Sequence, residues 1–177
     1  MSVISLEDSV ILKMDPFAHQ AKQYLLSRPT YPSLFLDRIR ARAPATTQRS
    51  STCLDVGCGS GQLTETLIQV FDRVVGVDRS KPQLEQALVS KLKLPSADQN
   101  RIEYLSVDDA TKLIQFPSES FDCVTVAQTL HWLPLKQSLT EFSRVLRPGG
   151  ILAAMGYGVC RVDNSPSGEW ISCSSKP

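Results

Sequence analysis

Four residues in one short turn have the types and the spacing of a cofactor-binding loop. Asp55 is followed by Gly57, Gly59 and Gly61, which places a glycine at every second position after an acidic residue. Glycine adopts backbone angles that other residues avoid, and it lets a ligand approach the main chain closely. The preceding segment 52–56 is apolar and of strand type, and a helical pattern follows the last glycine. The stretch therefore predicts a cofactor-binding turn between a strand and a helix.

The glycine spacing bears on which cofactor the turn would bind. The fingerprint of dinucleotide-binding folds is G-x-G-x-x-G, in which the third glycine is set back so that the helix can pack closely against the strand. Here the third glycine, Gly61, stands one position nearer. A nicotinamide-dependent oxidoreductase is therefore the weaker alternative, and a lack of NAD binding would exclude it.

A second acidic residue ends the next strand candidate. Asp78 closes segment 73–78, twenty-three positions after Asp55, and Arg79 follows it. A carboxylate at this place can accept hydrogen bonds from both hydroxyls of a ribose, as in other nucleoside-binding folds. Asp78 and Arg79 are therefore predicted to contact the cofactor. The structural alternative is that Asp78 only supports the start of the next helix, beside Ser80.

The elements that must position these residues alternate along the chain. Five segments are rich in β-branched and apolar residues and are predicted to be buried strands: 52–56, 73–78, 101–107, 121–127 and 149–156. Segments of helical period lie between several of them. This order predicts an α/β fold with a doubly wound, mostly parallel sheet, whose ligands bind at the carboxyl ends of the strands.

Three helices are predicted to flank the sheet. The helix after the glycine turn has an apolar stripe at Leu63, Leu67, Ile68 and Phe71. The next helix begins with a capping box, in which Ser80 and Gln83 each bond the other's backbone N–H. The third helix has an apolar stripe at Leu135, Leu139, Phe142, Val145 and Leu146, and the sequence "RPGG" is expected to end it.

The spacing D-x-G-x-G-x-G after a strand resembles motif I of the class I S-adenosylmethionine-dependent methyltransferases, and specifically of their type 11-like group. The stretches "YLSVDDATKL", "SFDCVTVAQTLHWL" and "EFSRVLRPGGILAAMGYG" resemble later motifs of the same family, and the matches together cover residues 52–156. The resemblance implies a Rossmann-like sheet and S-adenosylmethionine as the cofactor. No metal site is expected.

The same resemblance assigns roles to individual residues. It implies that Asp55 faces the ammonium of the cofactor's methionine, directly or through water, and that Asp109 accepts from the adenine amino group while the next amide binds the ring. The full set of implied cofactor-binding residues is Asp55, Gly57, Gly59, Gly61, Asp78, Arg79, Asp109, Ala110 and Gln128.

Two further stretches of the sequence bear on the identity of the methyl acceptor. "SRPTYP" and "AQTLHW" resemble the small-molecule branch that includes trans-aconitate methyltransferase, so the implied substrate is a small molecule, with a carboxylic acid as one candidate. His131 is the candidate base or hydrogen-bond donor, and Trp132 the candidate pocket wall. The alternative is a core Trp132 beside a surface His131. Tyr24, Arg28 and Tyr31 form a candidate lid, whose alternative is a helix that merely packs on the sheet.

Composition limits the partners. Nineteen basic and eighteen acidic residues leave a net charge of +1 without a one-sided block, so a dedicated nucleic-acid binder is not expected. No apolar run approaches the roughly 18 residues of a membrane span, which predicts a cytoplasmic chain. The five cysteines lack C-x-x-C spacing and are expected to be reduced thiols. The oligomeric state is left open.

Three regions are predicted: a helical segment at 1–50, the cofactor-binding domain at 51–158 and an irregular tail at 159–177. The tail is too short and too polar to supply the helix and the sixth and seventh strands that the resemblance implies. We therefore expect a C-terminally truncated member of the family, with strand 149–156 at an open sheet edge. The alternative function is a non-catalytic, methyltransferase-like binding or regulatory protein.

Overall fold

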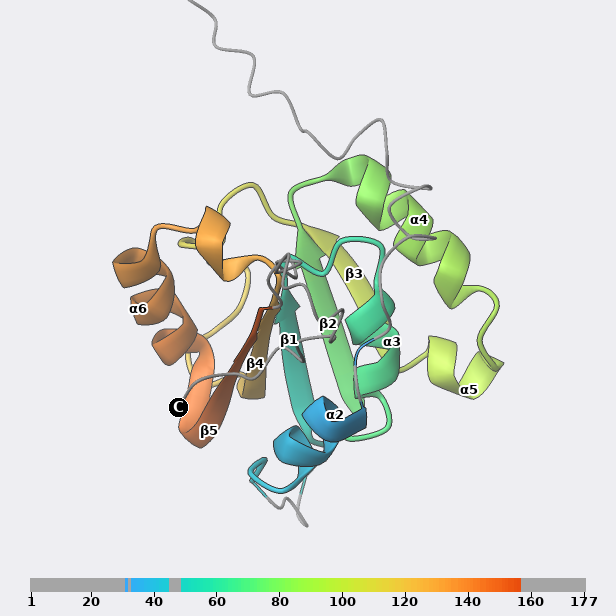
Figure 1. Ribbon diagram of the computed structural model, residues 1–177, viewed down its shortest axis with the longest axis horizontal. Helices are drawn as coiled ribbons and strands as arrows, with labels where there is room; N and C mark the ends of the chain where they lie inside the picture. Colours follow the sequence, from blue (N-terminus) through green and yellow to red (C-terminus); the bar gives the residue numbers. More distant parts are fainter. Residues whose placement is uncertain (1–30, 32, 45–48, 157–177) are drawn as a thin grey trace, which may run out of the picture.

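A five-stranded parallel sheet forms the centre of the molecule (Figure 1). The computed structural model describes residues 31, 33–44 and 49–156. The strand order is β3-β2-β1-β4-β5, and every neighbouring pair is parallel. The strands are β1 (Thr52–Val56), β2 (Arg73–Asp78), β3 (Ile102–Ser106), β4 (Phe121–Ala127) and β5 (Leu146–Met155). The predicted doubly wound, mostly parallel α/β sheet is confirmed.

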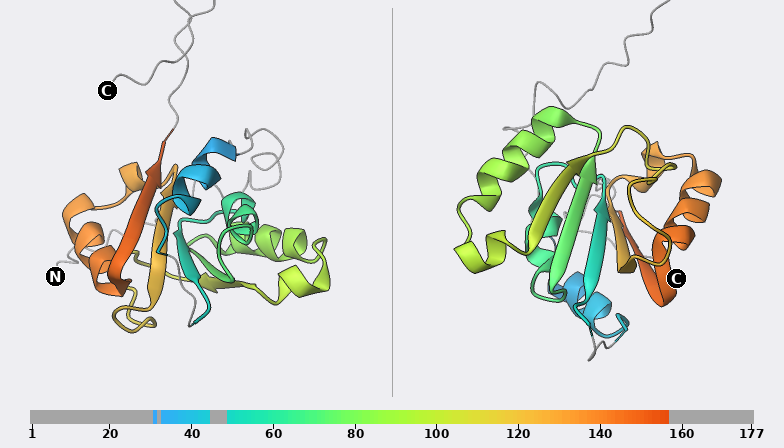
Figure 2. Two further views of the ribbon diagram at one scale, coloured as in Figure 1. Left: turned by 90° about the horizontal axis from the view of Figure 1, so that it is seen from below. Right: turned by 180° about the vertical axis from the view of Figure 1, so that it is seen from behind.

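Helices cover both faces of this sheet (Figure 2). They are α2 (Ser33–Arg40), α3 (Gln62–Leu67), α4 (Lys81–Lys91), α5 (Ser96–Gln99) and α6 (Leu135–Val145), with a 3-10 turn η1 (Leu130–Trp132). Leu36 of α2 and Leu67 of α3 pack with Cys53 on one face, whereas Phe142 of α6 packs with Leu54 on the other. Neighbouring residues of β1 thus point to opposite layers, as the period of two in a strand requires.

The fifth strand begins earlier than its sequence predicts. "RPGG" does not form a helix-ending loop, because α6 ends at Val145 and β5 starts at Leu146. The register against β4 passes from Phe121↔Leu146 to Cys123↔Ile151, so extra residues of β5 bulge out between these pairs. Gly149 has a φ of 79° in this bulge. The bulge accommodates a proline and two glycines inside an edge strand.

The helix predictions need two corrections. Ser80 does precede α4, but its side chain makes no capping hydrogen bond, so the predicted capping box is wrong. The reason is that Asp78 Oδ1 accepts the Ser80 backbone N–H at 2.8 Å. In α6, Phe142 and Val145 are buried as predicted, while Leu135 and Leu139 of the same stripe are 53% and 39% exposed. Helix α5 and turn η1 were not expected from the sequence.

A buried carboxylate ties together the amino ends of three strands. Asp122 of β4 accepts hydrogen bonds from Arg49 at both oxygens, from Arg147 of β5 at 3.0 Å, and from the Thr52 backbone N–H of β1 at 2.8 Å. Burial acts to raise the pKa of Asp122, but the hydrogen bonds and the two guanidinium charges outweigh it and hold the pKa below its ordinary value. This cluster fixes the sheet at the end opposite the glycine turn.

Three of the cysteines lie in the described residues and all three are free thiols. Cys53 and Cys123 are buried at paired positions of β1 and β4, and Cys58 is half-buried in the glycine turn. Their expected state is therefore confirmed for these three. Across the described part of the chain, no helix is long and apolar enough to cross a membrane, and no three metal-ligating side chains gather.

Candidate cofactor-binding site

The predicted turn connects β1 to α3 at the carboxyl end of the sheet. Gly57, Gly59 and Gly61 have φ values of 69°, 55° and 85°, all in the left-handed region that favours glycine. The turn is fixed to the next strand, because the backbone N–H groups of Gly57 and Cys58 donate to the Val77 carbonyl at 2.8 and 3.1 Å. The three glycines therefore allow a left-handed backbone conformation in which any other residue would be strained.

The three glycines differ in what surrounds them. A Cβ on Gly57 would collide with Thr129, whose own Cβ would be 2.7 Å away, and one on Gly61 would collide with the Tyr104 hydroxyl and ring. At Gly59 the nearest atom would be Gln83 Oε1 at 3.8 Å, an ordinary contact distance. Gly57 and Gly61 are thus enclosed by protein, whereas Gly59 has space beside it as far as the described residues go.

Asp55 lies inside the protein rather than on the surface of the turn. Its side chain is 1% exposed, and its two oxygens accept from the hydroxyls of Thr64 at 2.7 Å and Thr125 at 2.8 Å. Burial raises the pKa of Asp55 to about 6, with the two threonine hydroxyls opposing the rise and Asp78 adding to it. Asp55 thereby connects β1, α3 and β4 below the glycines, and a contact to an ammonium remains a prediction.

Asp78 connects the glycine turn to helix α4. Its Oδ2 accepts the Gly59 N–H and its Oδ1 accepts the Ser80 N–H, both at 2.8 Å. Asp78 thus supports the start of helix α4, which was the structural alternative to a role in cofactor binding. A contact between Asp78 and a ribose hydroxyl remains a prediction. Arg79 is exposed beside it.

The predicted adenine-binding pair lies beyond the end of β3. Asp109 Oδ1 accepts from the Thr111 backbone N–H at 2.9 Å and from the Thr111 hydroxyl at 2.6 Å, and Ala110 is half-buried. A cavity of about 500 Å³ includes Asp109 and Leu105 in its lining. The Val107 N–H donates to the Asp78 carbonyl at 3.0 Å, which joins this segment to the end of β2. The ribose and adenine candidates are therefore neighbours along one sheet edge.

The segment after β4 approaches the turn from the other side. Gln128 has a φ of 56°, rare for a residue with a side chain, and its Nε2 is buried without a partner in the described residues. Thr129 Oγ1 donates to the Gly57 carbonyl at 3.2 Å, and the Trp132 N–H donates to the Thr129 carbonyl at 2.9 Å. These bonds hold η1 near the glycine turn.

His131 and Trp132 are both exposed on η1, and Trp132 is 65% exposed. Trp132 is therefore not a core residue, which removes one structural alternative. Their rings lie 5.1 Å apart. Of the lid candidates, Tyr24 and Arg28 lie outside the described residues. Tyr31 is described and packs against the apolar layer that contains Leu36.

The unpartnered polar atoms test whether these residues suit a nucleoside cofactor. Ser80 Oγ, Gln83 Oε1 and Gln128 Nε2 are buried and lack hydrogen-bond partners in the part of the chain that the structure describes. All three belong to segments at the carboxyl edge, beside the glycines and Asp78. A ligand with hydroxyl and amino groups would pair such atoms, so the residues fit S-adenosylmethionine. Ser80, Gln83, Thr64, Thr125 and Tyr104 were not predicted as part of the site.

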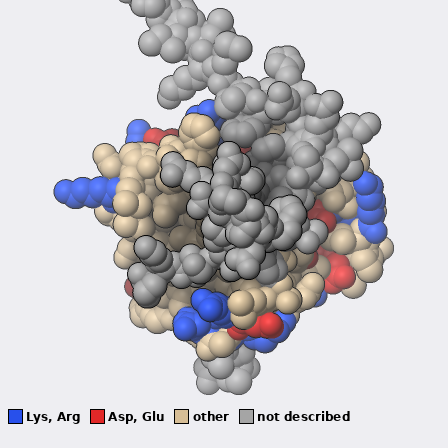
Figure 3. Space-filling model, viewed as in Figure 1, with Lys and Arg blue, Asp and Glu red and all other residues tan. Residues whose placement is uncertain are grey.

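Charge on the outside is mixed. Figure 3 shows Lys and Arg groups separated by uncharged surface and interrupted by Asp and Glu on the face in view. No single-sign field is visible among the coloured residues of this face. This agrees with the near-zero net charge of +1.

Comparison with known proteins decides the family. A family model described as "Methyltransferase domain" matches residues 54–154, which include the glycine turn, Asp78, Asp109 and all but the last residue of β5. The chain belongs to this methyltransferase family. The methyltransferase fold was predicted correctly, and so was the S-adenosylmethionine-dependent character of the family.

The relatives of this methyltransferase chain support the assignment. Methyltransferase pgmE of Aspergillus terreus is 31% identical over 139 residues, 76% of this chain and 41% of the relative. Demethylmenaquinone methyltransferase of Leptospira interrogans is 34% identical over 122 residues, 67% and 47% of the two chains. The chain thus spans about half the length of the curated relatives it matches, or somewhat less.

Solved structures agree on the fold. A type II methyltransferase structure from Anaeromyxobacter dehalogenans is 36% identical with a TM-score of 0.61, over 77% of this chain and 52% of that one. Geranyl diphosphate C-methyltransferase from Streptomyces coelicolor, solved with S-adenosylhomocysteine, is 19% identical with a TM-score of 0.59, over 69% and 44% of the two chains. The second match supports the methyltransferase fold alone.

Proposed function

We propose that this chain binds S-adenosylmethionine at the carboxyl edge of β1, β2 and β4 and contributes to methyl transfer onto a small-molecule acceptor. The observation that carries the proposal is the convergence of the left-handed glycines, the Asp78 carboxylate and three unpartnered buried polar atoms at this edge. Membership of the methyltransferase family supports it.

Each residue of the site would contact or support a different part of the cofactor. The cofactor supplies a methyl group on a positively charged sulfur. Gly59 leaves the space beside the turn, Asp78 holds both the turn and the ribose, and the segment at Asp109 and Ala110 binds the adenine. Asp55 keeps the turn in place through Thr64 and Thr125. Fixing the reacting groups in line supplies much of the rate in such displacements.

The acceptor proposed here is a small molecule, with carboxylic acids as the first class to test. A carboxylate is already a nucleophile and needs no base, whereas an alcohol or phenol would need one. His131 is the proposed hydrogen-bonding group or base and Trp132 the proposed pocket wall, since both are exposed on a turn held near Gly57. The trans-aconitate branch remains part of this proposal, as does the lid role of Tyr24, Arg28 and Tyr31.

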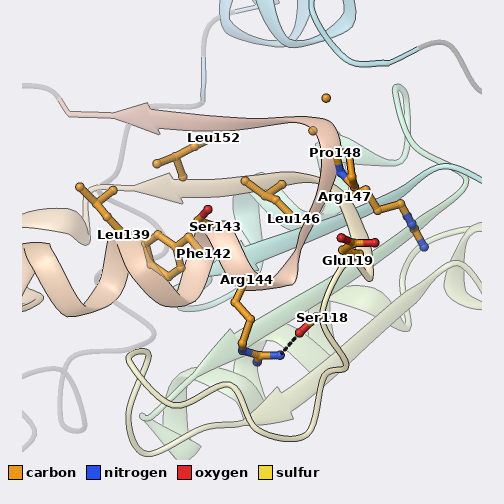
Figure 4. Close-up of a pocket in the computed structure, with 12 residues that line it drawn as sticks. Ser118, Glu119, Leu139, Phe142, Ser143, Arg144, Leu146, Arg147, Pro148 and Leu152 are labelled. Carbon is orange, nitrogen blue, oxygen red and sulfur yellow. Dashed lines mark hydrogen bonds between the residues drawn. The ribbon is translucent and has the colours of Figure 1, made fainter.

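A non-catalytic binding role is the second candidate, and the sheet edge favours it. In the described residues β5 has β4 as its sole strand partner, and Leu152 is 38% exposed. A cavity of about 600 Å³ lies between β5 and α6, lined by Leu139, Phe142 and Leu152 and bordered by Arg144, which donates to Ser118 (Figure 4). An open, partly apolar edge can pair with another strand.

A methyl-transfer assay separates the two candidates. The chain is incubated with methyl-labelled S-adenosylmethionine and a panel of small carboxylic acids, alcohols and amines, and label in the acceptor is counted. Transfer to one acceptor class supports the enzyme. If cofactor binds but no acceptor is labelled, the binding role is favoured. In an active chain, His131→Asn with unchanged turnover at every pH would remove the proposed base.

A further inference from the structure

The start of helix α4 holds two buried polar side chains that the fold itself does not use. Ser80 is 5% exposed and is the N-cap residue of this 11-residue helix, and Gln83 is 3% exposed and lies in its first turn. Ser80 Oγ and Gln83 Oε1 have no hydrogen-bond partner in the described residues. Buried polar atoms in native proteins are almost always paired, so these two call for a partner beyond the described residues.

The usual use of such residues is unavailable because of Asp78. In a capping box the Gln83 side chain would accept the Ser80 backbone N–H. That N–H donates instead to Asp78 Oδ1 at 2.8 Å, and the Ser80 side chain forms no cap bond. The carboxylate therefore replaces the capping box and leaves both side chains available at the helix start.

The geometry places these atoms beside the open part of the glycine turn. Gln83 Oε1 lies 3.8 Å from the position of a Cβ on Gly59, the one glycine of the turn that the described residues do not enclose. The Gly59 N–H donates to Asp78 Oδ2, and the Ser80 N–H donates to the other oxygen of the same carboxylate. Gly59, Asp78, Ser80 and Gln83 thus surround one small region.

The chemistry of the two side chains matches a sugar diol. An amide oxygen accepts a hydrogen bond from a hydroxyl, and a serine hydroxyl both donates and accepts. Each carboxylate oxygen of Asp78 already accepts one backbone N–H, so Asp78 can accept fewer hydrogen bonds from the two hydroxyls of a diol. We infer that Ser80 and Gln83 bind the ribose hydroxyls of the cofactor together with Asp78. This inference rests on the proposed cofactor site.

The test compares two ligands and two variants by calorimetry on the full chain. The ligands are S-adenosylhomocysteine and its analogue that lacks both ribose hydroxyls. The variants are Gln83→Leu, which removes the inferred contact, and Gln137→Leu, a control on the exposed surface of α6. Binding of both ligands to each protein is measured, and thermal unfolding without ligand is recorded.

We expect Gln83→Leu to weaken S-adenosylhomocysteine at least tenfold, to leave the hydroxyl-free analogue nearly unchanged, and to raise the ligand-free Tm. The Tm should rise because the substitution removes an unpaired buried oxygen. Gln137→Leu should match the wild type, and Ser80→Ala should reproduce the ligand selectivity in a weaker form.

Two outcomes would overturn the inference in distinguishable ways. If Gln83→Leu weakens both ligands equally, or neither, then Gln83 does not contact the ribose, and the proposed cofactor site stands without it. If the folded wild-type chain binds neither ligand, then the proposed function fails and the inference fails with it.

Discussion

The hydroxyl of Tyr104 on β3 occupies the place where a Cβ atom on Gly61 would have to stand. The same ring passes over Gly76 of β2, where two of its carbons would lie 2.8 Å from a Cβ. Burial is the main cause that raises the pKa of Tyr104 above its ordinary value, and the charge of Glu65 adds to it. One tyrosine thus fills the space left by two glycines and sets how closely α3 approaches the sheet.

Replacing Gly61 by alanine should therefore destabilise the fold strongly. The change forces a left-handed backbone on alanine, at about 1–2 kcal/mol, and a clash with Tyr104, at about 1–3 kcal/mol more. Gly149→Ala is the matched control, because its φ is 79° but no atom lies within 4 Å of the added Cβ. Urea unfolding should show the larger loss for Gly61→Ala. Equal losses of unfolding free energy in the two variants would mean that the Tyr104 side chain moves aside without cost.

Gly59→Ala should separate binding from stability. A Cβ there meets only Gln83 Oε1 at 3.8 Å, so the free energy of unfolding should fall by about as much as in Gly149→Ala, roughly 1–2 kcal/mol. The methyl group would, however, enter the space assigned to the cofactor. We expect calorimetry to show at least tenfold weaker S-adenosylhomocysteine binding in Gly59→Ala and none of this loss in Gly149→Ala. Unchanged binding in both variants would place the cofactor elsewhere.

Asp55 should make stability depend on pH. Its pKa rises from 3.8 to about 6 in the folded chain. The stability that Asp55 contributes is therefore complete below pH 3.8 and is lost as the pH rises through about 6, because the folded chain holds a proton that the unfolded chain has released.

Asp55→Asn removes this titration. The difference in free energy of unfolding between variant and wild type should shift in favour of the variant by about 2 kcal/mol between pH 4 and pH 7. Urea unfolding at several pH values measures it. A difference that stays constant over this range would show that Asp55 titrates normally, in spite of its burial and of Asp78 nearby.

Asp122→Asn should destabilise the amino end of the sheet. It leaves Arg49 and Arg147 without their charge partner, which should cost about 2–4 kcal/mol, since both guanidinium groups are partly exposed to water. The control Asp37→Asn breaks the exposed Arg40 pair and should change stability by less than about 1 kcal/mol. Chemical unfolding at neutral pH compares them, and similar losses would contradict a buried cluster.

Much of the sheet could be predicted because three of its strands are short, mainly apolar runs with clear ends. Segments 52–56, 73–78 and 121–127 match the observed strands, since burial on both faces selects such runs. The start of β5 could not be predicted in this way. Its proline and glycines indicate a loop locally, and only pairing with β4 through a bulge makes them part of a strand.

The site was predictable in its backbone and less so in its side chains. The spacing of the glycines and the acid at Asp78 follow from local rules, but the loss of the capping box depends on Asp78 competing for the Ser80 N–H. Tyr104 resembles an ordinary strand residue until β2 and β3 are paired. One missed signal was available, because Asp122 is the one charged residue of a fully buried strand and required a partner.

Calorimetric titration of the folded chain with S-adenosylhomocysteine, beside Asp78→Asn, tests the central claim most directly. Circular dichroism would first establish that both proteins are folded. We predict micromolar binding to the wild type and at least tenfold weaker binding to Asp78→Asn, because Asp78 supports both the glycine turn and the ribose. A folded wild-type chain that binds nothing, or a variant that binds equally well, would contradict the cofactor site described above.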